Sequence, residues 1–225
     1  MANTKTTINA VIHPKYNDNP IDIEKTIKAL ERNNFVVHYF ETGTEAISYL
    51  KGRIQNKRVA IGDSRTLLKL NAYEALSEVN KDVMDIQRPL PGESFRDTAL
   101  RTMGRDVFLT SVNALAQTGE MVNIDGTGNR VAASLFGSQE VFFVLGINKI
   151  TPDLASAIYR ARNVAAPLNS KKNKKSSLNP CATLEEKCYD CGSPDRICNA
   201  LTIYYKKMRN MQTMEVIIIN ESLGF

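Results

Sequence analysis

The chain has 225 residues with a formal net charge of +5; 43% of the residues are hydrophobic and 24% are charged. This length and balance fit one α/β domain, or one domain with an appendage, and exclude a wholly disordered chain. The longest apolar runs are far shorter than the roughly 20 residues of a transmembrane helix, and the amino-terminal residues lack the apolar core of a signal peptide. We therefore expect a cytoplasmic protein with no membrane partner.

Apolar runs and helical periodicities alternate along the chain. Asn19-Pro20 is typical of a helix start, and apolar residues then recur at helical spacing to about Asn33. Runs rich in β-branched and aromatic residues predict strands, with helices between most of them. These strands cover residues 35–40, 58–63, 83–86, 106–110, 120–125, 140–147 and 214–220. Such continuously apolar strands predict an α/β fold with an open, mostly parallel sheet and helices on both faces.

Three polar turns follow predicted strands, at the carboxyl ends where ligands of parallel sheets usually bind. They cover residues 62–66, 110–113 and 125–130. In the third, DGTGNR, two glycines allow close backbone approach and Arg130 can pair with a phosphate or carboxylate. The pattern matches neither the dinucleotide fingerprint nor the P-loop. Helix capping explains each turn alone, whereas the three together suggest a ligand pocket.

Acid–base candidates are few. Glu120 begins the strand that ends at Asp125, and it is a candidate base or nucleophile, with a solvated strand-end glutamate as the alternative. These two carboxylates are five residues apart and should face opposite sides of the strand, so they do not predict a carboxylate pair. His13 and His38 have no obvious partners, so a Ser–His–Asp site is not predicted.

Residues 167–198 form a basic, cysteine-rich segment without clear periodicity. Four lysines fall in NSKKNKK, residues 169–175. Such a run is typical of a solvated loop, and no aromatic residues interleave with it as they would in a platform for single-stranded nucleic acid. Nucleic-acid binding is therefore not favoured.

All cysteines of the chain lie in this segment, with the spacing C-x6-C-x2-C-x6-C. They are Cys181, Cys188, Cys191 and Cys198. Without an export signal, four thiolates favour a metal over disulfides, and the central C-x2-C is a chelating turn. Zinc and an iron–sulfur cluster both stay open as the bound metal. Redox-active thiols, or four buried cysteines without metal, are the alternatives.

Several separate motifs occur in an order that resembles a known family. They are TGEMVNIDGTGNRVAASLFG, VLGINKI, RARNVAAPLN, CYDCGSPDRIC and the terminal SLGF. Together they resemble the LUD domain family, the lactate-utilisation group, in its short cysteine-bearing bacterial form, over about residues 20–225. The resemblance implies a NagB/RpiA/CoA-transferase-like fold. It implies a single domain over residues 1–225, with residues 167–198 as an insertion or excursion.

The resemblance also implies which positions line a pocket. These are Gly62, Ser64, Thr66, Asn113, Glu120, Asn123, Asp125, Gly126, Gly128, Asn129 and Arg130. One departure is visible, because relatives tend to have a Gly-Gly-Ser turn where this chain has Gly62-Asp63-Ser64. The additional carboxylate of Asp63 opposes an anion bound at that turn.

The function implied is support of lactate or related 2-hydroxy-acid utilisation, by oxidation to the keto acid. We expect a small anionic ligand, either a hydroxy or keto acid or a phosphate-bearing molecule, with a cysteine-bound metal or cluster and other lactate-utilisation components as partners. The fold relatives leave an alternative, an isomerase or transferase for a sugar phosphate or acyl-CoA with Glu120 as base or nucleophile. A non-catalytic regulatory or nucleic-acid-binding protein is a further alternative.

Overall fold

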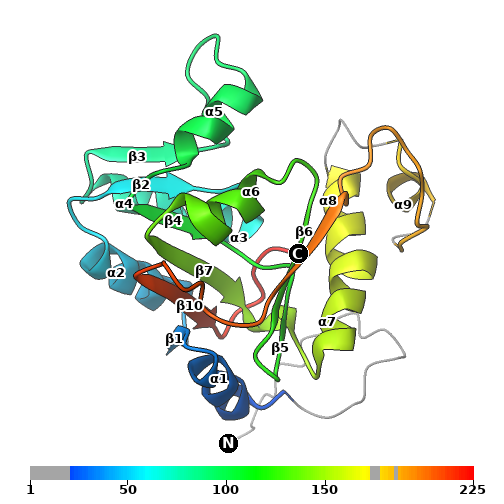
Figure 1. Cartoon of the computed structure of the whole chain (residues 1–225), viewed down its shortest axis with the longest axis horizontal. Coiled ribbons are helices and arrows are strands. Elements are labelled where there is room, and N and C mark those ends of the chain that lie inside the picture. The colour runs from blue at the N-terminus through cyan, green and yellow to red at the C-terminus, as the bar shows by residue number, and fades with distance from the viewer. Residues whose placement is uncertain (1–20, 173–177, 185–186) are drawn as a thin grey trace, which may run out of the picture.

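A computed structural model describes residues 21–172, 178–184 and 187–225 (Figure 1). The helix start expected at Asn19-Pro20 lies outside these residues. The first described helix, α1 (Ile23–Arg32), begins after Asp22, whose side chain accepts a hydrogen bond from the backbone N–H of Lys25 and so caps the helix. No helix in the described part of the chain is long and apolar enough to cross a membrane.

The larger sheet, within the described residues, has six strands in the order β1-β10-β7-β4-β2-β3. Every neighbouring pair is parallel. The strands are β1 (Val36–Phe40), β2 (Arg58–Ile61), β3 (Asp82–Asp85), β4 (Val107–Thr110), β7 (Glu140–Gly146) and β10 (Thr213–Ile219). The central strands β4 and β7 are buried along their whole length, which explains their continuous apolar runs. The predicted α/β fold with a mostly parallel sheet is confirmed.

Helices cover both faces of this sheet (Figure 1). On one face Leu30 of α1 packs with Phe108 and Phe143. On the other face a second core gathers side chains of α2, α3 and α4 around Phe142 and Ile217. The remaining helices in chain order are α2 (Gly43–Arg53), α3 (Arg65–Lys69), α4 (Ala72–Ser77), α5 (Phe95–Thr102), α6 (Asn129–Ala132), α7 (Leu154–Arg160), α8 (Ala166–Lys172) and α9 (Pro180–Thr183).

A second sheet was not expected from the sequence. Its strands, in the order β8-β5-β6-β9, are β8 (Ile150–Thr151), β5 (Ala114–Ala116), β6 (Met121–Asp125) and β9 (Ala200–Tyr204). Strand β6 runs antiparallel to β5 and β9 and is therefore not part of the parallel sheet. The apolar run of β6 suggested a strand of the parallel sheet because both faces of β6 are buried. Met121 packs in the core with Phe108, and Val122 packs against Ala157 of α7.

The basic, cysteine-rich segment begins in a helix. A π-helical turn at residues 161–165 joins α7 to α8, so the helix expected near residues 153–164 continues to Lys172. Lys171 and Lys172 therefore end a helix, whereas the sequence suggested a loop. Lys174 and Lys175 lie outside the described residues.

A buried charge cluster lies at the amino ends of β7 and β10. The carboxylates of Glu140 and Glu215 are almost fully buried, with side chains 6% and 3% exposed. Arg53, the last residue of α2, pairs with both, at 2.7 Å and 3.0 Å. Lys57 adds a contact to Glu140 at 3.2 Å, and Tyr49 donates a hydrogen bond to Glu215 at 2.9 Å. Buried carboxylates require such partners, so Arg53 ties α2 to the sheet.

The substitution Arg53→Met is expected to lower the free energy of unfolding by about 2 kcal/mol. This is less than the cost of breaking a fully buried pair, because Arg53 is about a third exposed and the glutamates keep Lys57 and Tyr49. Urea denaturation measures the change. The matched control is Arg58→Met, because Arg58 pairs with Asp106 at the surface, where ion pairs contribute roughly 0–1 kcal/mol. Equal losses in the two variants would contradict the expectation.

Candidate functional site

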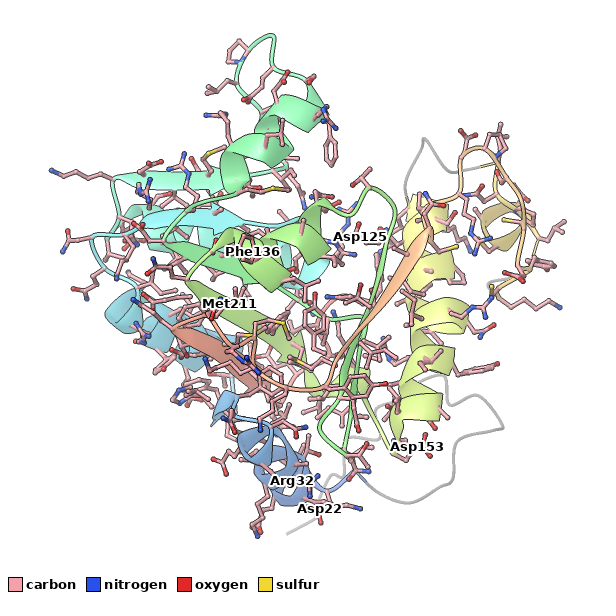
Figure 2. The ribbon with its side chains drawn as sticks, viewed as in Figure 1. Asp22, Arg32, Asp125, Phe136, Asp153 and Met211 are labelled. Carbon is pink, nitrogen blue, oxygen red and sulfur yellow. The ribbon has the colours of Figure 1, made fainter. Side chains whose placement is uncertain are left out.

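A cavity of about 470 Å³ lies where the turns after β2, β4, β6 and β7 meet α8. Its charged lining residues are Asp63, Arg65, Asp125, Arg130 and Lys149. Other polar residues of the lining include Ser64, Ser111, Asn113 and Asn129. The volume is in the usual range for small-molecule sites. In Figure 2 Asp125 marks the β6 end of this region.

A second hollow, of about 600 Å³, is larger but in a less suitable place. It is lined by Arg58, Asp106 and Gln139, which lie at the amino ends of β2, β4 and β7, and by Phe136 and Met211, labelled in Figure 2. Ligands of parallel sheets bind at the carboxyl ends of the strands. We therefore take the cavity beside Asp125 as the candidate site.

The three polar turns expected to form a pocket do converge on this cavity. The pocket residues of the sequence analysis that line it are Ser64, Asn113, Asp125, Gly126, Asn129 and Arg130. The Ser64 side chain also caps α3 by accepting from the backbone N–H of Leu67. The Asn113 side chain accepts a hydrogen bond from the backbone N–H of Ile124 at 2.7 Å, which fixes the turn after β4 against β6.

The other expected pocket residues lie behind the lining. Asn123 accepts a hydrogen bond from the backbone N–H of Asn113 at 3.1 Å and so supports that turn. A Cβ at Gly62 would lie 2.8 Å from the ring of Phe108, so glycine is needed there for packing. Gly128 has a φ of +81°, a left-handed conformation that favours glycine, and it begins α6. Thr66 contacts Lys149, as described below.

Glu120 is far from the cavity. It precedes β6, whose other end is Asp125, so about 17 Å of strand separates them. Its carboxylate accepts a hydrogen bond from the Thr118 hydroxyl. Glu120 is not among the residues that line the candidate site.

Arg130 is the cationic side chain best placed to receive an anion. Its Nη2 donates to the backbone carbonyl of Ile124 at 2.6 Å, and its Nε lies 3.6 Å from a carboxylate oxygen of Asp125. Among the described residues, its Nη1 has no hydrogen-bond partner. Asp125 is buried and also accepts from the backbone N–H of Val131. The guanidinium is therefore fixed at the cavity wall with donors left over for a carboxylate or phosphate.

The carboxylate of Asp63 also lines the cavity, at the turn after β2. One of its oxygens accepts a hydrogen bond from the Gln87 side chain at 2.8 Å. This residue adds negative charge to the lining at the turn after β2, which also carries Arg65, whereas Arg130 belongs to the turn after β6. We therefore expect an anionic group to approach Arg130 rather than the Asp63 turn.

Lys149 is a functional candidate that the sequence reasoning missed. It ends a short 3₁₀ turn after β7 and is 4% exposed. Its ammonium nitrogen hydrogen-bonds the hydroxyls of Thr66 and Ser111, at 3.1 and 3.0 Å, and the carbonyl of Val112 at 3.0 Å. Burial, together with the nearby charge of Arg160 and then Arg130, holds the pKa of Lys149 well below its usual range. A lone lysine within the apolar motif VLGINKI was the available signal.

The carboxyl-terminal residues cover Lys149. The Leu223 carbonyl accepts a hydrogen bond from the Thr66 hydroxyl, and the Leu223 N–H donates to the Asn148 side chain at 3.0 Å. Gly224 has a φ of +67°, and a Cβ there would lie 2.6 Å from Thr66 Oγ1. Phe225 reaches the cavity lining. This segment thus shields the lysine from solvent while leaving its side chain at the cavity.

The cysteine segment forms part of the same wall. The backbone N–H of Asn199 donates to the Asp125 carbonyl at 3.0 Å, and its side chain donates to the Gly126 carbonyl at 2.9 Å. A Cβ at Gly126 would lie 3.1 Å from the carbonyl oxygen of Ile197. Glycine at 126 therefore lets the chain beside Cys198 pack directly on the third polar turn.

The four thiols are free and partly buried. Cys188 Sγ accepts weak hydrogen bonds from Arg162 and from the backbone of Asp190. Cys198 Sγ accepts from Arg196 Nε at 3.2 Å. Burial raises the pKa of the Cys198 thiol, and Arg196 partly offsets this effect.

Within the described ranges, no group of three or more Cys, His, Asp or Glu side chains could hold a metal ion. The four thiols are therefore not assembled into a metal site in this structure. The metal stays a prediction from the spacing, and no chemical step below runs through it.

The fold and the cavity define an α/β protein with a polar ligand site at the carboxyl ends of its parallel strands. The chain belongs to the LUD domain family, whose model matches residues 23–219.

A solved structure with a similar fold is a crystal structure of a DUF162 family protein from Deinococcus radiodurans. The TM-score is 0.52 at 13% sequence identity, with 89% of this chain and 99% of that chain covered. A search of the curated proteins gives no match.

Proposed function

We propose that this protein supports the utilisation of lactate or a related 2-hydroxy acid, and that the cavity beside Arg130 binds the hydroxy acid or its 2-oxo product. Membership of the LUD domain family supports the pathway class. The observation that carries the ligand class is the Arg130 guanidinium, which is fixed by Asp125 and Ile124 and keeps Nη1 available at the cavity. A planar guanidinium matches a carboxylate in geometry and charge.

The remaining lining suits the other end of such an acid. Asn113 and Ser111 also line the cavity, where Ser111 contacts Lys149, and they offer neutral polar groups for the oxygen at C2. Oxidation of a 2-hydroxy acid releases a pair of electrons, so this role requires a redox-active acceptor, which we place in a partner component. The chain's own part is to bind and orient the acid.

The alternative of an isomerase or transferase receives no support from the position of Glu120. That reading needs a carboxylate beside the substrate, and Glu120 does not line the cavity. The carboxylates that do line it, Asp63 and Asp125, are already engaged by Gln87 and by Arg130 with Val131.

Isothermal titration of the full chain with L-lactate and with pyruvate tests the proposal. Arg130→Gln is expected to weaken binding about 10- to 100-fold, because a hydrogen bond to a charged group contributes about 1.5–3 kcal/mol. The matched control is Arg32→Gln, at the exposed end of α1, far from Asp125 in Figure 2. That variant should bind as the wild type does.

Two results would contradict the proposal. One is the absence of binding for both acids, and the other is binding that Arg130→Gln leaves unchanged. Ribose 5-phosphate serves as a further probe, because tight binding of it in place of the acids would favour the sugar-phosphate alternative.

The cysteine-bound metal is a second part of the proposal and has its own test. Metal and acid-labile sulfide are measured on protein purified without oxygen, together with a visible spectrum. We expect stoichiometric zinc or iron, with the loss of most of it in Cys191→Ser and no loss in the control Ser193→Ala. Wild-type protein that contains no metal would contradict this part and leave the cavity proposal standing.

A further inference from the structure

We propose that Lys149 is a nucleophilic lysine that forms an imine with the carbonyl carbon of a 2-oxo acid bound in the cavity. The identity of the acid rests on the proposed function, whereas the reactivity of the amine rests on its own surroundings. The geometry is the basis: Lys149 and Arg130 both line the cavity, and the Lys149 nitrogen lies 3.0 Å from the hydroxyl of Ser111, another lining residue.

Among the residues that the structure describes, the amine has no acidic partner. Its hydrogen bonds go to two hydroxyls and a backbone carbonyl, those of Thr66, Ser111 and Val112. A buried ammonium is normally paired with a carboxylate, because removing it from water is costly. Among the described residues, no salt bridge joins Lys149 to a carboxylate. The Thr66 hydroxyl donates to the Leu223 carbonyl, so a neutral amine fits this pattern when it donates to Thr66 and Val112 and accepts from the Ser111 hydroxyl.

The charged groups around the amine also favour its neutral form. Arg160 on α7 and Arg130 on α6 lower the pKa of Lys149 in addition to its burial. Arg65 lines the same cavity, as do the carboxylates Asp63 and Asp125. Both carboxylates are directed to other partners, Asp63 to Gln87 and Asp125 to Arg130 and Val131. A desolvated lysine beside cationic groups is a recurring form of amine nucleophile.

The step balances without an oxidant. The neutral nitrogen attacks C2 of the 2-oxo acid and forms a carbinolamine. The carbon–oxygen bond then breaks, a carbon–nitrogen double bond forms, and the oxygen leaves as water with the two hydrogens of the amine. The hydroxyls of Thr66 and Ser111, which already contact the nitrogen, can pass these protons to the departing oxygen. Arg130 holds the carboxylate during the step.

The experiment is reductive trapping on the full chain. Protein is incubated with pyruvate and sodium cyanoborohydride, digested, and analysed by mass spectrometry. We expect a reduced pyruvyl group on Lys149 in preference to exposed lysines such as Lys28. Labelling should increase with pH and reach half its maximum well below the usual pKa of lysine, because the neutral amine reacts. Lys149→Arg should abolish this adduct, and the control Lys28→Arg should keep it.

Wild-type protein alone also gives a decisive readout, in case Lys149→Arg does not fold. L-lactate has the carboxylate but no carbonyl, so an excess of it should protect Lys149 from labelling. Pyruvate that binds in the titration but labels only exposed lysines overturns the imine and leaves the proposed function intact. Pyruvate that neither binds nor labels Lys149 overturns both. If an excess of L-lactate does not lower the labelling of Lys149, then pyruvate reacts with Lys149 without occupying the acid site beside Arg130. This result also overturns the proposal.

Discussion

The substitution Gly146→Ala is expected to lower the free energy of unfolding by about 1–3 kcal/mol. Gly146 is the last residue of β7, and the chain after β10 crosses directly over it. A Cβ there would lie 2.7 Å from the backbone nitrogen of Leu223 and 2.6 Å from Asn148 Oδ1, and closer still to the Glu221 carbonyl. Two of these atoms are backbone, so a strand or the carboxyl-terminal segment has to move. Urea denaturation, with thermal unfolding as a check, measures the loss.

The control for this prediction is Gly52→Ala. Gly52 lies in α2, and a Cβ there has nothing within 4 Å. Alanine is the better helix former, so this variant is expected to gain about 0.5–1 kcal/mol. The two alanines should therefore change stability with opposite signs. A Gly146→Ala protein as stable as the wild type would show that the carboxyl-terminal segment does not lie against β7 as described.

The same substitution should also reduce the labelling of Lys149 by pyruvate at a fixed pH, because only the neutral amine reacts. Leu223 accepts the hydrogen bond of the Thr66 hydroxyl, and Thr66 in turn contacts Lys149. A displaced carboxyl-terminal segment would expose that lysine to water. Its pKa would then rise toward the usual range, because the largest cause of the shift is burial.

The second large effect is expected for Tyr204→Ala, at about 3–5 kcal/mol of lost stability. Tyr204 is the last residue of β9 and is fully buried. Its ring packs edge-to-face on Phe143 of the parallel sheet, with 5.2 Å between the ring centroids. It therefore joins the second sheet to the main core. Tyr204→Phe keeps the ring but loses the 2.6 Å hydrogen bond with Ser134, so about 1 kcal/mol is expected.

The neighbouring Tyr205 provides the matched control. It is 59% exposed, so Tyr205→Ala is expected to change stability by about 0.5 kcal/mol or less. Comparison of the two alanine variants by urea denaturation isolates the contribution of the buried ring. Similar losses for Tyr204→Ala and Tyr205→Ala would contradict the packing of β9 on the main core.

The parallel sheet could be predicted because its central strands appear in the sequence as continuous apolar runs. Central strands such as β4 and β7 are buried on both faces, so their sequences are continuously apolar and separated by polar turns. Strand β6 gives the same signal for a different reason, since α7 covers the face that the main core does not. Strand β9 was missed although residues 200–204 read ALTIY; its first two residues are exposed and only Tyr204 is fully buried.

The turns that line the site could be predicted from the sequence, whereas the buried lysine beneath them could not. Each polar turn follows a predicted strand, and that signal grouped Asn113, Asp125 and Arg130. Strand β6 lies in the second sheet, and its turn meets the turn after β4 through the hydrogen bond from the Ile124 N–H to the Asn113 side chain. Lys149 lies in the motif VLGINKI, but the motif does not show that its amine is buried among neutral partners contributed by distant parts of the chain. Glu120 was named as a pocket position through the family resemblance; it precedes β6, at the end of that strand remote from Asp125, and it does not line this cavity.

The most direct test of the central claim is the position of the bound acid in a crystal of the protein soaked with pyruvate at a concentration that saturates the titration. We predict density in the cavity beside Asp125, with the carboxylate against the Arg130 guanidinium and C2 facing the Lys149 nitrogen. An empty cavity under those conditions, or pyruvate bound only elsewhere, such as the hollow beside Phe136, would contradict it.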